Sequence, residues 1–311
     1  CWADCFGVGA AGASCTSGIK KISEKEERQV FWPSGEQAFD DIVSFEPKSI
    51  FLLGGKQGSG KTRFLIYKIM HLLFNNENVA INWINIEDPK EKIILMMLVY
   101  LTGISFKKLK RDDLTESELK RVIQARDLIE KFNISFADRA MTVGEITSNH
   151  IRFCSDNKDK LCIVIIDNIM LLEDQKEDKM QNKIDDDIAL GIKSLNQITN
   201  SLGGVGSAVI LVHHFVKEQA SKNNAVRAYR PTTADLKGSS RYADVSTTVL
   251  LLNKIGDYKD LMLIFSHLKH ILSRLMIIDV PKNRDGETGL IRYFGDLANL
   301  NFEIINSEID E

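Results

Sequence analysis

The sequence lacks several features that would assign it to a particular class of protein. No apolar run reaches the roughly 18 residues needed to span a bilayer, and no signal-peptide pattern opens the chain. We therefore expect a cytoplasmic protein, or one in the equivalent compartment of an organelle or infected cell, with no membrane partner. The 40 basic and 43 acidic residues give a net charge of −3, so nucleic acid could bind only at local patches or loops.

Cysteine is scarce and irregularly spaced. An odd count without C-x-x-C spacing favours reduced thiols over a disulfide framework. The first three cysteines could instead be the remnant of a metal knuckle, although their spacing matches no ligand pattern well, and zinc is the less favoured alternative. The five residues are Cys1, Cys5, Cys15, Cys154 and Cys162.

The sequence does contain a glycine-rich phosphate-binding motif. Residues 55–62 read GKQGSGKT, directly after the apolar run at 49–53 and before a helical pattern at 63–74. Glycines let successive backbone N–H groups face a phosphate, and the helix start, a lysine and a hydroxyl complete the cradle. We expect ATP or another nucleoside triphosphate with Mg²⁺, bound by Gly55, Gln57, Gly58, Ser59, Gly60, Lys61, Thr62 and Arg63.

A large α/β domain fits the length of 311 residues and the 44% hydrophobic content. We assign residues 34–311 to this domain and residues 1–33 to a leader and linker helix. The charged stretch at 18–32 suits an arm that docks on a neighbouring subunit, with a solvated linker helix as the alternative.

Strand and helix patterns alternate and are followed by consecutive strands. The apolar, β-branched run at 161–168 is typical of a central parallel strand. The order predicts a mostly parallel sheet flanked by helices, with an antiparallel C-terminal extension. Expected strands lie at 49–53, 79–86, 133–138, 161–168, 208–214, 247–252, 261–265, 275–280 and 289–294, and helices at 63–74, 90–100, 113–132, 142–154 and 183–202.

Three polar residues follow strands at the edge where parallel-sheet enzymes bind ligands. Asp167 ends an apolar strand in the Walker-B manner and is expected to hold Mg²⁺, a capping aspartate being the alternative. Glu87 could activate the attacking water or be a turn residue. His213 and His214 end another buried strand, and one of them could contact the γ-phosphate, although spacing alone favours a structural histidine.

Two cations near the C-terminus form another candidate element. Lys282 and Arg284 stand two residues apart past a strand, so in extended chain both project to one side. They are suited to reach a phosphate across a subunit boundary, although basic hairpins are common.

Taken in order, these motifs resemble the hexameric replicative DNA helicases of the DnaB type, with their RecA-like core. They are also similar to the helicase half of phage primase-helicases and to the mitochondrial helicase. Residues 230–240, RPTTADLKGSS, look like the R-P-x-x-x-D-L-R-[EG]-S-G segment of the family. Residues 282–289, KNRDGETG, look like its K-x-R-x-G-x-x-G arginine-finger element. The resemblance covers about residues 34–305.

The resemblance implies roles for the candidate nucleotide-site residues. Lys61 and Thr62 would bind phosphate and Mg²⁺, and Asp167 would be the Walker-B acid. Glu87 would be the general base and His214 the γ-phosphate sensor. Lys282 and Arg284 would reach the nucleotide of the adjacent protomer in a hexameric ring.

The resemblance also implies residues that bind single-stranded DNA. Lys237, Gly238 and Ser240 match the loop that follows DNA phosphates. Residues 216–230, with Lys217, Arg227 and Arg230, are a further candidate channel loop, or else an ordinary basic surface loop.

The chain departs from the family pattern at several positions. Ser240 stands where Gly is usual, Asp244 where Gln is common and Thr247 where Asp is usual, and residues 253–273 exceed the usual length. The leading hypothesis is an ATP-dependent helicase that translocates on single-stranded DNA and unwinds forked duplex, with a primase or loader as a further partner. The alternatives are a RecA-like or KaiC-like ATPase, or a DNA-binding or loading module without unwinding activity.

Overall fold

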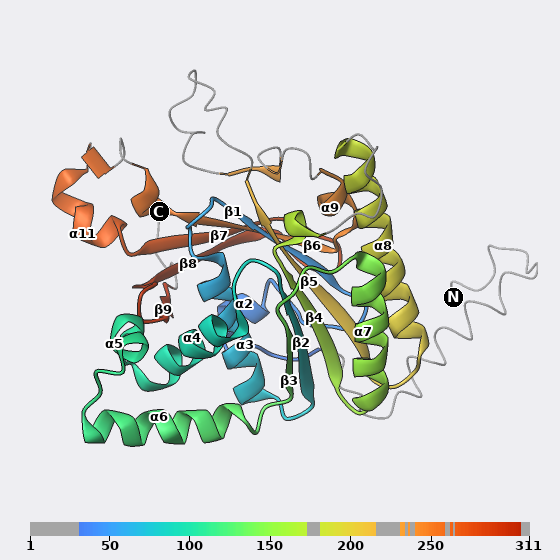
Figure 1. Ribbon diagram of the computed structural model, residues 1–311. Coiled ribbons are helices and arrows are strands. Elements are labelled where there is room, and N and C mark those ends of the chain that lie inside the picture. The colour runs from blue at the N-terminus through green and yellow to red at the C-terminus, as the bar shows by residue number, and fades with distance from the viewer. Residues whose placement is uncertain are drawn as a thin grey trace, which may run out of the picture. The chain divides into compact units, whose positions relative to one another are not determined.

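The fold is built on a nine-stranded sheet with the strand order β3-β2-β4-β5-β1-β6-β7-β8-β9 (Figure 1). The computed structural model describes residues 31–172, 181–215, 231–233, 236, 240–258, 262–263 and 265–305, without the side chains of residues 181, 182 and 240. Neighbouring strands are parallel from β3 to β6 and antiparallel from β6 to β9. This confirms the predicted mostly parallel sheet with an antiparallel extension.

The strands lie close to their predicted positions. They span Ile50–Gly55 (β1), Val79–Asn85 (β2), Ile134–Ala137 (β3), Leu161–Asp167 (β4), Gly206–His214 (β5), Thr248–Lys254 (β6), Leu275–Asn283 (β7), Gly289–Asp296 (β8) and Asn301–Ile304 (β9). The last of these was not predicted, because residues 301–304 are too few to show a clear alternation of apolar and polar side chains.

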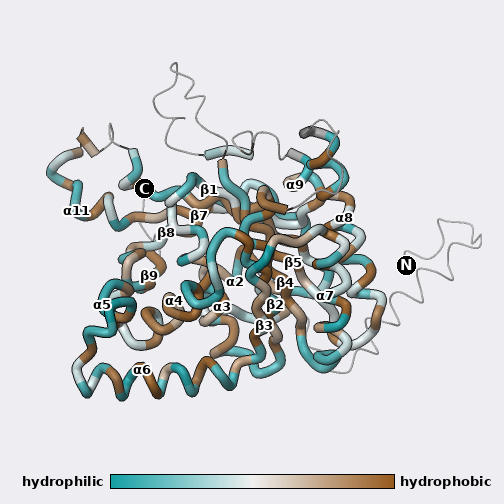
Figure 2. The backbone as a smooth tube through the Cα atoms, in the orientation of Figure 1, coloured by the Kyte–Doolittle hydropathy of each residue, from teal (hydrophilic) through white to brown (hydrophobic). Residues whose placement is uncertain are grey.

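Helices cover both faces of the sheet, which explains why its central strands are apolar throughout (Figure 2). Along β4, Ile163 and Ile165 enter one core, whereas Val164 and Ile166 enter the other. The first core is completed by α3 (Lys61–Asn75), α4 (Lys90–Thr102), α5 (Phe106–Arg111) and α6 (Glu116–Ile129), and the second by α7 (Val143–Asp156), α8 (Gln181–Ser201) and α9 (Ser240–Val245).

Local capping explains where two of these helices begin. Thr115 and Glu118 form a reciprocal capping box at the start of α6, and Thr142 and Glu145 form another at the start of α7. Asp112 adopts a left-handed conformation after α5, which separates that helix from α6.

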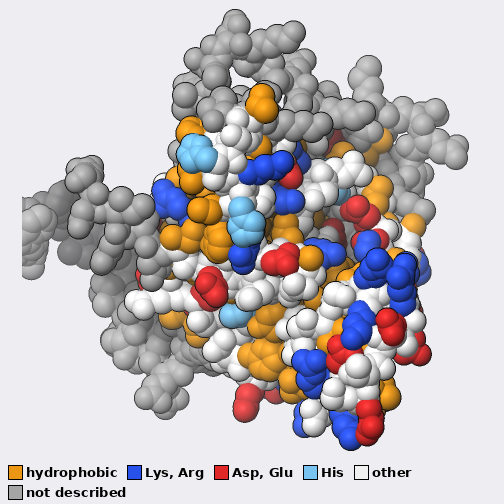
Figure 3. All heavy atoms as spheres, turned by 90° about the vertical axis from the view of Figure 1, so that its left-hand side faces the viewer, with side chains coloured by type: hydrophobic (Ala, Val, Ile, Leu, Met, Phe, Trp, Pro, Cys, Tyr) orange, Lys and Arg blue, Asp and Glu red, His pale blue; other side chains and the backbone are white. Residues whose placement is uncertain are grey.

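The strand predicted at 261–265 is wrong where the structure describes it. Met262 and Leu263 are helical, because β6 and β7 pair directly with each other and leave no position between them for another strand. The connection between them carries α11 (Lys269–Leu272). Figure 3 looks onto this side of the molecule, where hydrophobic side chains lie beside histidines; the exposed apolar residues of the connection are Leu263, Phe265, Leu268 and Ile271.

Residues from Trp32 onward form one compact unit. The Trp32 side chain is only 2% exposed, its indole N–H donates to Asn78 Oδ1 at 2.9 Å, and its backbone N–H donates to the Phe45 carbonyl at 2.9 Å. Trp32 therefore packs in the core, two residues before the predicted start of the ATPase domain.

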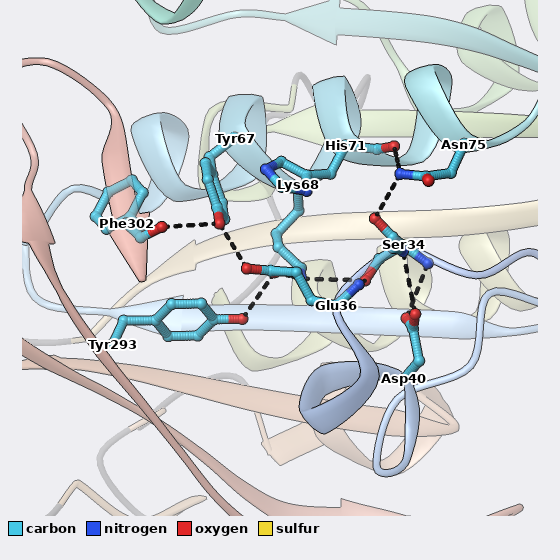
Figure 4. Close-up of polar contacts among 10 residues, drawn as sticks. Ser34, Glu36, Asp40, Tyr67, Lys68, His71, Asn75, Tyr293 and Phe302 are labelled. Carbon is cyan, nitrogen blue, oxygen red and sulfur yellow. Dashed lines mark hydrogen bonds and ion pairs between the residues drawn. The ribbon is translucent and has the colours of Figure 1, made fainter. Parts of the chain in front are cut away.

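A buried polar junction joins this N-terminal stretch to α3 and the C-terminal strands (Figure 4). The Glu36 carboxylate accepts from the Lys68 ammonium, from the Tyr67 hydroxyl at 2.5 Å and from the Tyr293 hydroxyl at 3.3 Å. The Lys68 ammonium also lies 3.5 Å from the ring centroid of Phe39. Burial lowers the pKa of Lys68 to about 8, although Glu36 opposes the shift.

Among the described residues, no helix combines the length and the apolar character needed to cross a membrane.

Candidate nucleotide site

The phosphate loop connects the end of β1 to the start of α3. Gly58 and Gly60 have φ values of +77° and +96°, in the left-handed region that favours glycine. A Cβ at Gly60 would also lie 2.4 Å from Leu297 Cδ2, so a side chain there would have to displace the Leu297 side chain of the β8–β9 turn. Glycine at position 60 of the GKQGSGKT pattern therefore suits both the left-handed backbone and the close packing of Leu297.

Lys61, the first residue of α3, turns its ammonium back into the loop. Its Nζ donates to the carbonyls of Gly55 at 3.1 Å and Lys56 at 2.9 Å, and lies 3.0 Å from His214 Nδ1. Burial lowers the pKa of Lys61 to about 8, while the charges of Asp167 and Glu87 oppose the shift. The described residues thus give this buried cation neutral hydrogen-bond partners and no carboxylate in direct contact.

His214 links Lys61 to Glu87. A lysine ammonium can only donate, so His214 Nδ1 must accept from Lys61. Nε2 then carries the ring proton and donates to Glu87 Oε2 across 3.0 Å. This arrangement requires a neutral imidazole, and it couples the side chain predicted to sense phosphate to the carboxylate predicted to activate water.

Asp167 and Thr62 form the polar pair at the end of β4. The Thr62 hydroxyl donates to Asp167 Oδ2 at 2.9 Å, whereas Oδ1 is buried without a hydrogen-bond partner among the described residues. Burial raises the pKa of Asp167 to about 6 and outweighs the Thr62 hydrogen bond, which lowers it. Since Mg²⁺ prefers hard oxygen ligands, an orphaned carboxylate oxygen beside a hydroxyl fits that ion.

Strand register brings these residues together. Gly55 of β1 pairs with His214 of β5, and Asn85 of β2 pairs with Asp167 of β4. The carboxyl ends of parallel strands meet at one edge of the sheet, which is where open α/β sheets bind ligands. The structure therefore gathers Lys61, Thr62, Glu87, Asp167 and His214 at that edge.

Three other residues predicted to bind the triphosphate have different surroundings. The Arg63 guanidinium donates to the carbonyls of Leu297 at 2.6 Å and Ala298 at 3.0 Å, which ties α3 to the β8–β9 turn. Gln57 is exposed at the tip of the loop, whereas Ser59 is buried and its hydroxyl finds no partner in the described part of the chain.

Lys282 and Arg284 lie at the opposite edge of the sheet. Asn283 between them pairs with Thr248, and Thr248 is level with Phe51 at the start of β1. The phosphate loop follows Gly55, so a rise of about 3.3 Å per residue separates the two levels by roughly 13 Å along the strands. Both cations donate to carbonyls at the end of α9: Lys282 to Ala243 at 2.6 Å, and Arg284 to Asp244 at 2.8 Å.

Most of the predicted DNA-binding residues lie outside the described residues: Lys217, Arg227, Arg230, Lys237 and Gly238. Ser240 begins α9, and its side chain is not described. Cys1, Cys5 and Cys15 also lie outside the described residues. Cys154 and Cys162 are free and buried.

Sequence reasoning missed three features, two of them near the site. Asn85 is buried beside Asp167, and its amide donates to the Asp88 carbonyl at 2.6 Å. The Thr247 hydroxyl bonds both the N–H and the carbonyl of Ile50, which holds β1 at its start. A cavity of about 240 Å³ is lined by residues that include Lys254, Arg274, Asp296 and Leu297. Only Asn85, at a predicted strand end, carried a usable signal.

Comparison with known proteins gives consistent results for the family and the fold. The family model described as "DnaB-like helicase C terminal domain" matches residues 32–302. The "Probable plasmid replicative DNA helicase" of Chlamydia trachomatis serovar L2 is 22% identical over 259 residues, which cover 81% of this chain and 54% of that protein. The "Replicative DNA helicase DnaB" of Helicobacter pylori strain 26695 is 21% identical over 286 residues, covering 83% and 56%. The chain thus spans about half the length of these relatives.

Solved structures show the same fold. A structure described as an ATPase domain superposes with a TM-score of 0.79 at 20% identity, covering 96% of this chain and all of that one. A DnaB-like replicative helicase, described together with its interactions with primase, gives a TM-score of 0.77 at 20% identity and covers 93% and 67%. At this level of identity the likeness shows a shared RecA-like architecture.

Proposed function

Because the chain belongs to the DnaB-like helicase C-terminal domain family, we propose that it is the ATP-hydrolysing motor of a ring-shaped replicative DNA helicase. Translocation on single-stranded DNA would separate the strands of a forked duplex. One observation supports the proposal: the side chains predicted to bind and hydrolyse the triphosphate lie together at one edge of the sheet, and Lys282 and Arg284 lie at the other edge. One subunit then offers a phosphate loop to the finger residues of the next.

The geometry supports specific roles at the phosphate edge. Lys61, with Gly55 and Gly58–Gly60, would hold the β- and γ-phosphates, and Arg63 would fix the start of α3 behind them. The cavity beside Leu297 is where we place the nucleoside end, since Leu297 also packs against Gly60. Thr62 and the free Oδ1 of Asp167 would hold Mg²⁺, which would neutralise charge on the phosphates.

Glu87 and His214 supply the remaining chemistry. Glu87 would accept a proton from the attacking water, because its carboxylate is part-exposed at the mouth of the site. His214 would turn Nδ1 from Lys61 to the γ-phosphate once Lys61 engages the nucleotide. The His214–Glu87 hydrogen bond would then connect phosphate sensing to the base.

Lys282 and Arg284 are proposed to act on the nucleotide of the neighbouring subunit. Their own phosphate loop is at the far edge of the sheet, so a contact across a subunit boundary is the arrangement that the register favours. Hydrolysis would then require assembly, and a homohexamer is the assembly we propose.

The DNA side of the proposal rests on the family pattern. Lys237, Gly238 and Ser240, together with Lys217, Arg227 and Arg230, would line the channel and follow phosphates without reading bases. Lys282 and Arg284 hold the end of α9, which follows this segment, so the finger and the DNA loop are connected within one subunit. A primase or a loader would be a further partner.

The alternatives are a RecA-like or KaiC-like ATPase, or a loading module that uses nucleotide as a structural ligand. The contact of Glu87 with His214 favours a hydrolytic site over a purely structural one. A strand-displacement assay on a forked duplex with MgATP tests the proposal. Unwinding by the wild type and none by Glu87→Gln is the expected result. DNA-stimulated hydrolysis without strand displacement would favour the RecA-like or KaiC-like ATPase, and nucleotide binding without hydrolysis would favour the loading module.

Catalysis between subunits is tested by mixing Arg284→Ala and Lys61→Ala subunits. We expect mixed rings to regain part of the turnover that neither variant shows alone, because each supplies the half that the other lacks. Arg126→Ala, which changes an exposed arginine on α6, serves as the control in the same mixtures. Failure to regain turnover at any ratio would count against the proposed arrangement.

A further inference from the structure

The connection between β6 and β7 begins at the phosphate edge of the sheet, and its first described residues, 255–258, have no role in the function proposed above. Leu252 of β6 pairs with Gly55 of β1, so the residues after Lys254 emerge beside the phosphate loop. The first and the last residues of the connection lie close together. A Cβ at Gly256 would lie 3.0 Å from Ser273 Cα, a backbone approach that only glycine allows easily.

Tyr258 is held firmly at the base of this connection. Its hydroxyl donates to Asn253 Oδ1 at 2.7 Å, and its backbone N–H donates to the Ile255 carbonyl at 3.2 Å. Its own carbonyl accepts from the Met262 N–H at 3.0 Å. Since Asn253 belongs to β6 and Ile255 is buried, the position of the tyrosine ring is set by the sheet.

The ring of Tyr258 faces the phosphate loop. The ammonium of Lys56, the second residue of the GKQGSGKT motif, lies 4.2 Å from the ring centroid, within the range of a cation–π contact. The Lys56 carbonyl accepts from the backbone N–H of Ser59 at 3.1 Å and from Lys61 Nζ at 2.9 Å. Residue 56 therefore supports the turn of the loop and the cation that is to meet the phosphate.

We propose that Tyr258 is a positioning residue for nucleotide binding, which holds the phosphate loop in place through its ring contact with Lys56. The extra residues between β6 and β7 thereby preorganise the loop before the triphosphate arrives, so less of the binding free energy is spent on ordering it. The inference rests on the proposed nucleotide site, because it assigns an effect on the affinity of that site.

The test measures binding of MgADP and of a non-hydrolysable MgATP analogue to the full chain by calorimetry. Tyr258→Leu keeps apolar bulk but removes the π face, and we expect it to weaken binding about threefold, the effect of one part-exposed cation–π contact. Tyr258→Phe keeps the ring and loses only the hydroxyl, so its Kd should stay close to that of the wild type. If Tyr258→Phe weakened binding as much as Tyr258→Leu, the effect would belong to the hydroxyl, and the proposal would be overturned.

A double-mutant cycle separates positioning from general damage to the fold. Lys56→Met removes the ammonium and keeps the length of the side chain, so in this background Tyr258→Leu should change the Kd no further. An equal loss in both backgrounds would mean that Tyr258 does not act through Lys56, and would overturn the proposal. The proposed function fails separately, if the wild type does not bind MgATP or if Lys61→Met binds it equally well.

Discussion

Two buried lysines on the same helix have different hydrogen-bond partners for their buried charges. Lys61 and Lys68 both lie on α3, and burial lowers the pKa of each to about 8. Lys68 is paired with the Glu36 carboxylate and packs on the Phe39 ring. Among the described residues, the Lys61 ammonium contacts the carbonyls of Gly55 and Lys56 and a ring nitrogen of His214. Lys68 therefore has its counter-charge inside the fold, whereas we propose that Lys61 receives its counter-charge from a bound phosphate.

The partners of a buried lysine distinguish a structural site from a proposed binding site more clearly than the shift of its pKa does. The shift has the same direction and the same main cause, burial, at both residues. The partners differ: an acceptor set that is complete and charged needs no ligand, while neutral acceptors leave the cation stabilised by less than a phosphate would provide. The four predictions below test this comparison.

The largest effect on stability is expected at the buried polar junction of Glu36 and Lys68. Glu36→Gln removes the carboxylate in contact with the buried Lys68 ammonium and leaves only the less direct charge of Asp40 among the described residues, so the free energy of unfolding should fall by about 3 kcal/mol. Chemical denaturation measures this change. Glu116→Gln, which breaks the exposed Glu116–Lys120 pair on α6, is the control and should cost less than about 0.5 kcal/mol. Adding Lys68→Met to Glu36→Gln should restore part of the loss; equal costs for the buried and exposed pairs would contradict the comparison.

The next effect concerns nucleotide turnover at the candidate nucleotide site, where Lys61 lies. Lys61→Met should reduce turnover of MgATP by about 10²–10³-fold, since it removes a preorganised cation from the phosphate site. Its free energy of unfolding should stay equal or increase, because no buried carboxylate in contact with Lys61 loses its partner. Turnover and denaturation assays on one preparation check both parts. A loss of stability as large as that of Glu36→Gln would show that Lys61 also has a structural role.

A smaller effect is a rise in stability with pH. The unfolded lysines keep their protons up to about 10.5, whereas folded Lys61 and Lys68 lose theirs near 8. Between these values the unfolded chain binds more protons, so the free energy of unfolding should increase, by about 1 kcal/mol per pH unit for each lysine. The increase in the free energy of unfolding per pH unit between pH 8 and pH 10 should be about half as large in Lys61→Met as in the wild type. An unchanged slope in that variant would contradict the assignment.

The smallest effect concerns Asp167. Its carboxyl has a pKa raised to about 6 by burial, and Mg²⁺ requires the ionised form. The metal-dependent part of nucleotide affinity should therefore decrease about tenfold per pH unit below pH 6. Titrations with and without Mg²⁺ at each pH isolate this part. Asp167→Asn should bind the nucleotide with Mg²⁺ more weakly at every pH, and its affinity should no longer depend on pH below 6. If the pH dependence persisted in this variant, it would arise from another group.

Much of this site was predictable because local patterns determine it. The GKQGSGKT motif requires left-handed glycines at Gly58 and Gly60, and the apolar run before Asp167 identifies a buried strand. Parallel strands place their carboxyl ends at one edge, so the nearness of Glu87, Asp167 and His214 follows from the order of the elements. Their roles in hydrolysis remain predictions, as do the finger and the DNA contacts.

Other features depend on contacts between distant segments and left no local pattern. The Leu297 side chain beside Gly60, the Tyr258 ring beside Lys56 and the strand β9 each arise where the C-terminal half folds back on the phosphate edge. The strand expected at 261–265 failed for the same reason, because pairing of β6 with β7 overrode the apolar run.

The sequence by itself determined that this chain has a phosphate loop, a mostly parallel sheet and a set of polar residues at strand ends, because period, turn chemistry and strand order are local properties. The tertiary structure decided which buried lysine is neutralised within the fold. Glu36 is 32 residues before Lys68 in the chain, and nothing in its surroundings distinguishes it from the other acidic residues of that stretch. Only packing brings Glu36 to Lys68 and leaves Lys61 without a carboxylate in direct contact in the described part of the chain, because burial and charge pairing are set by the three-dimensional position of each side chain.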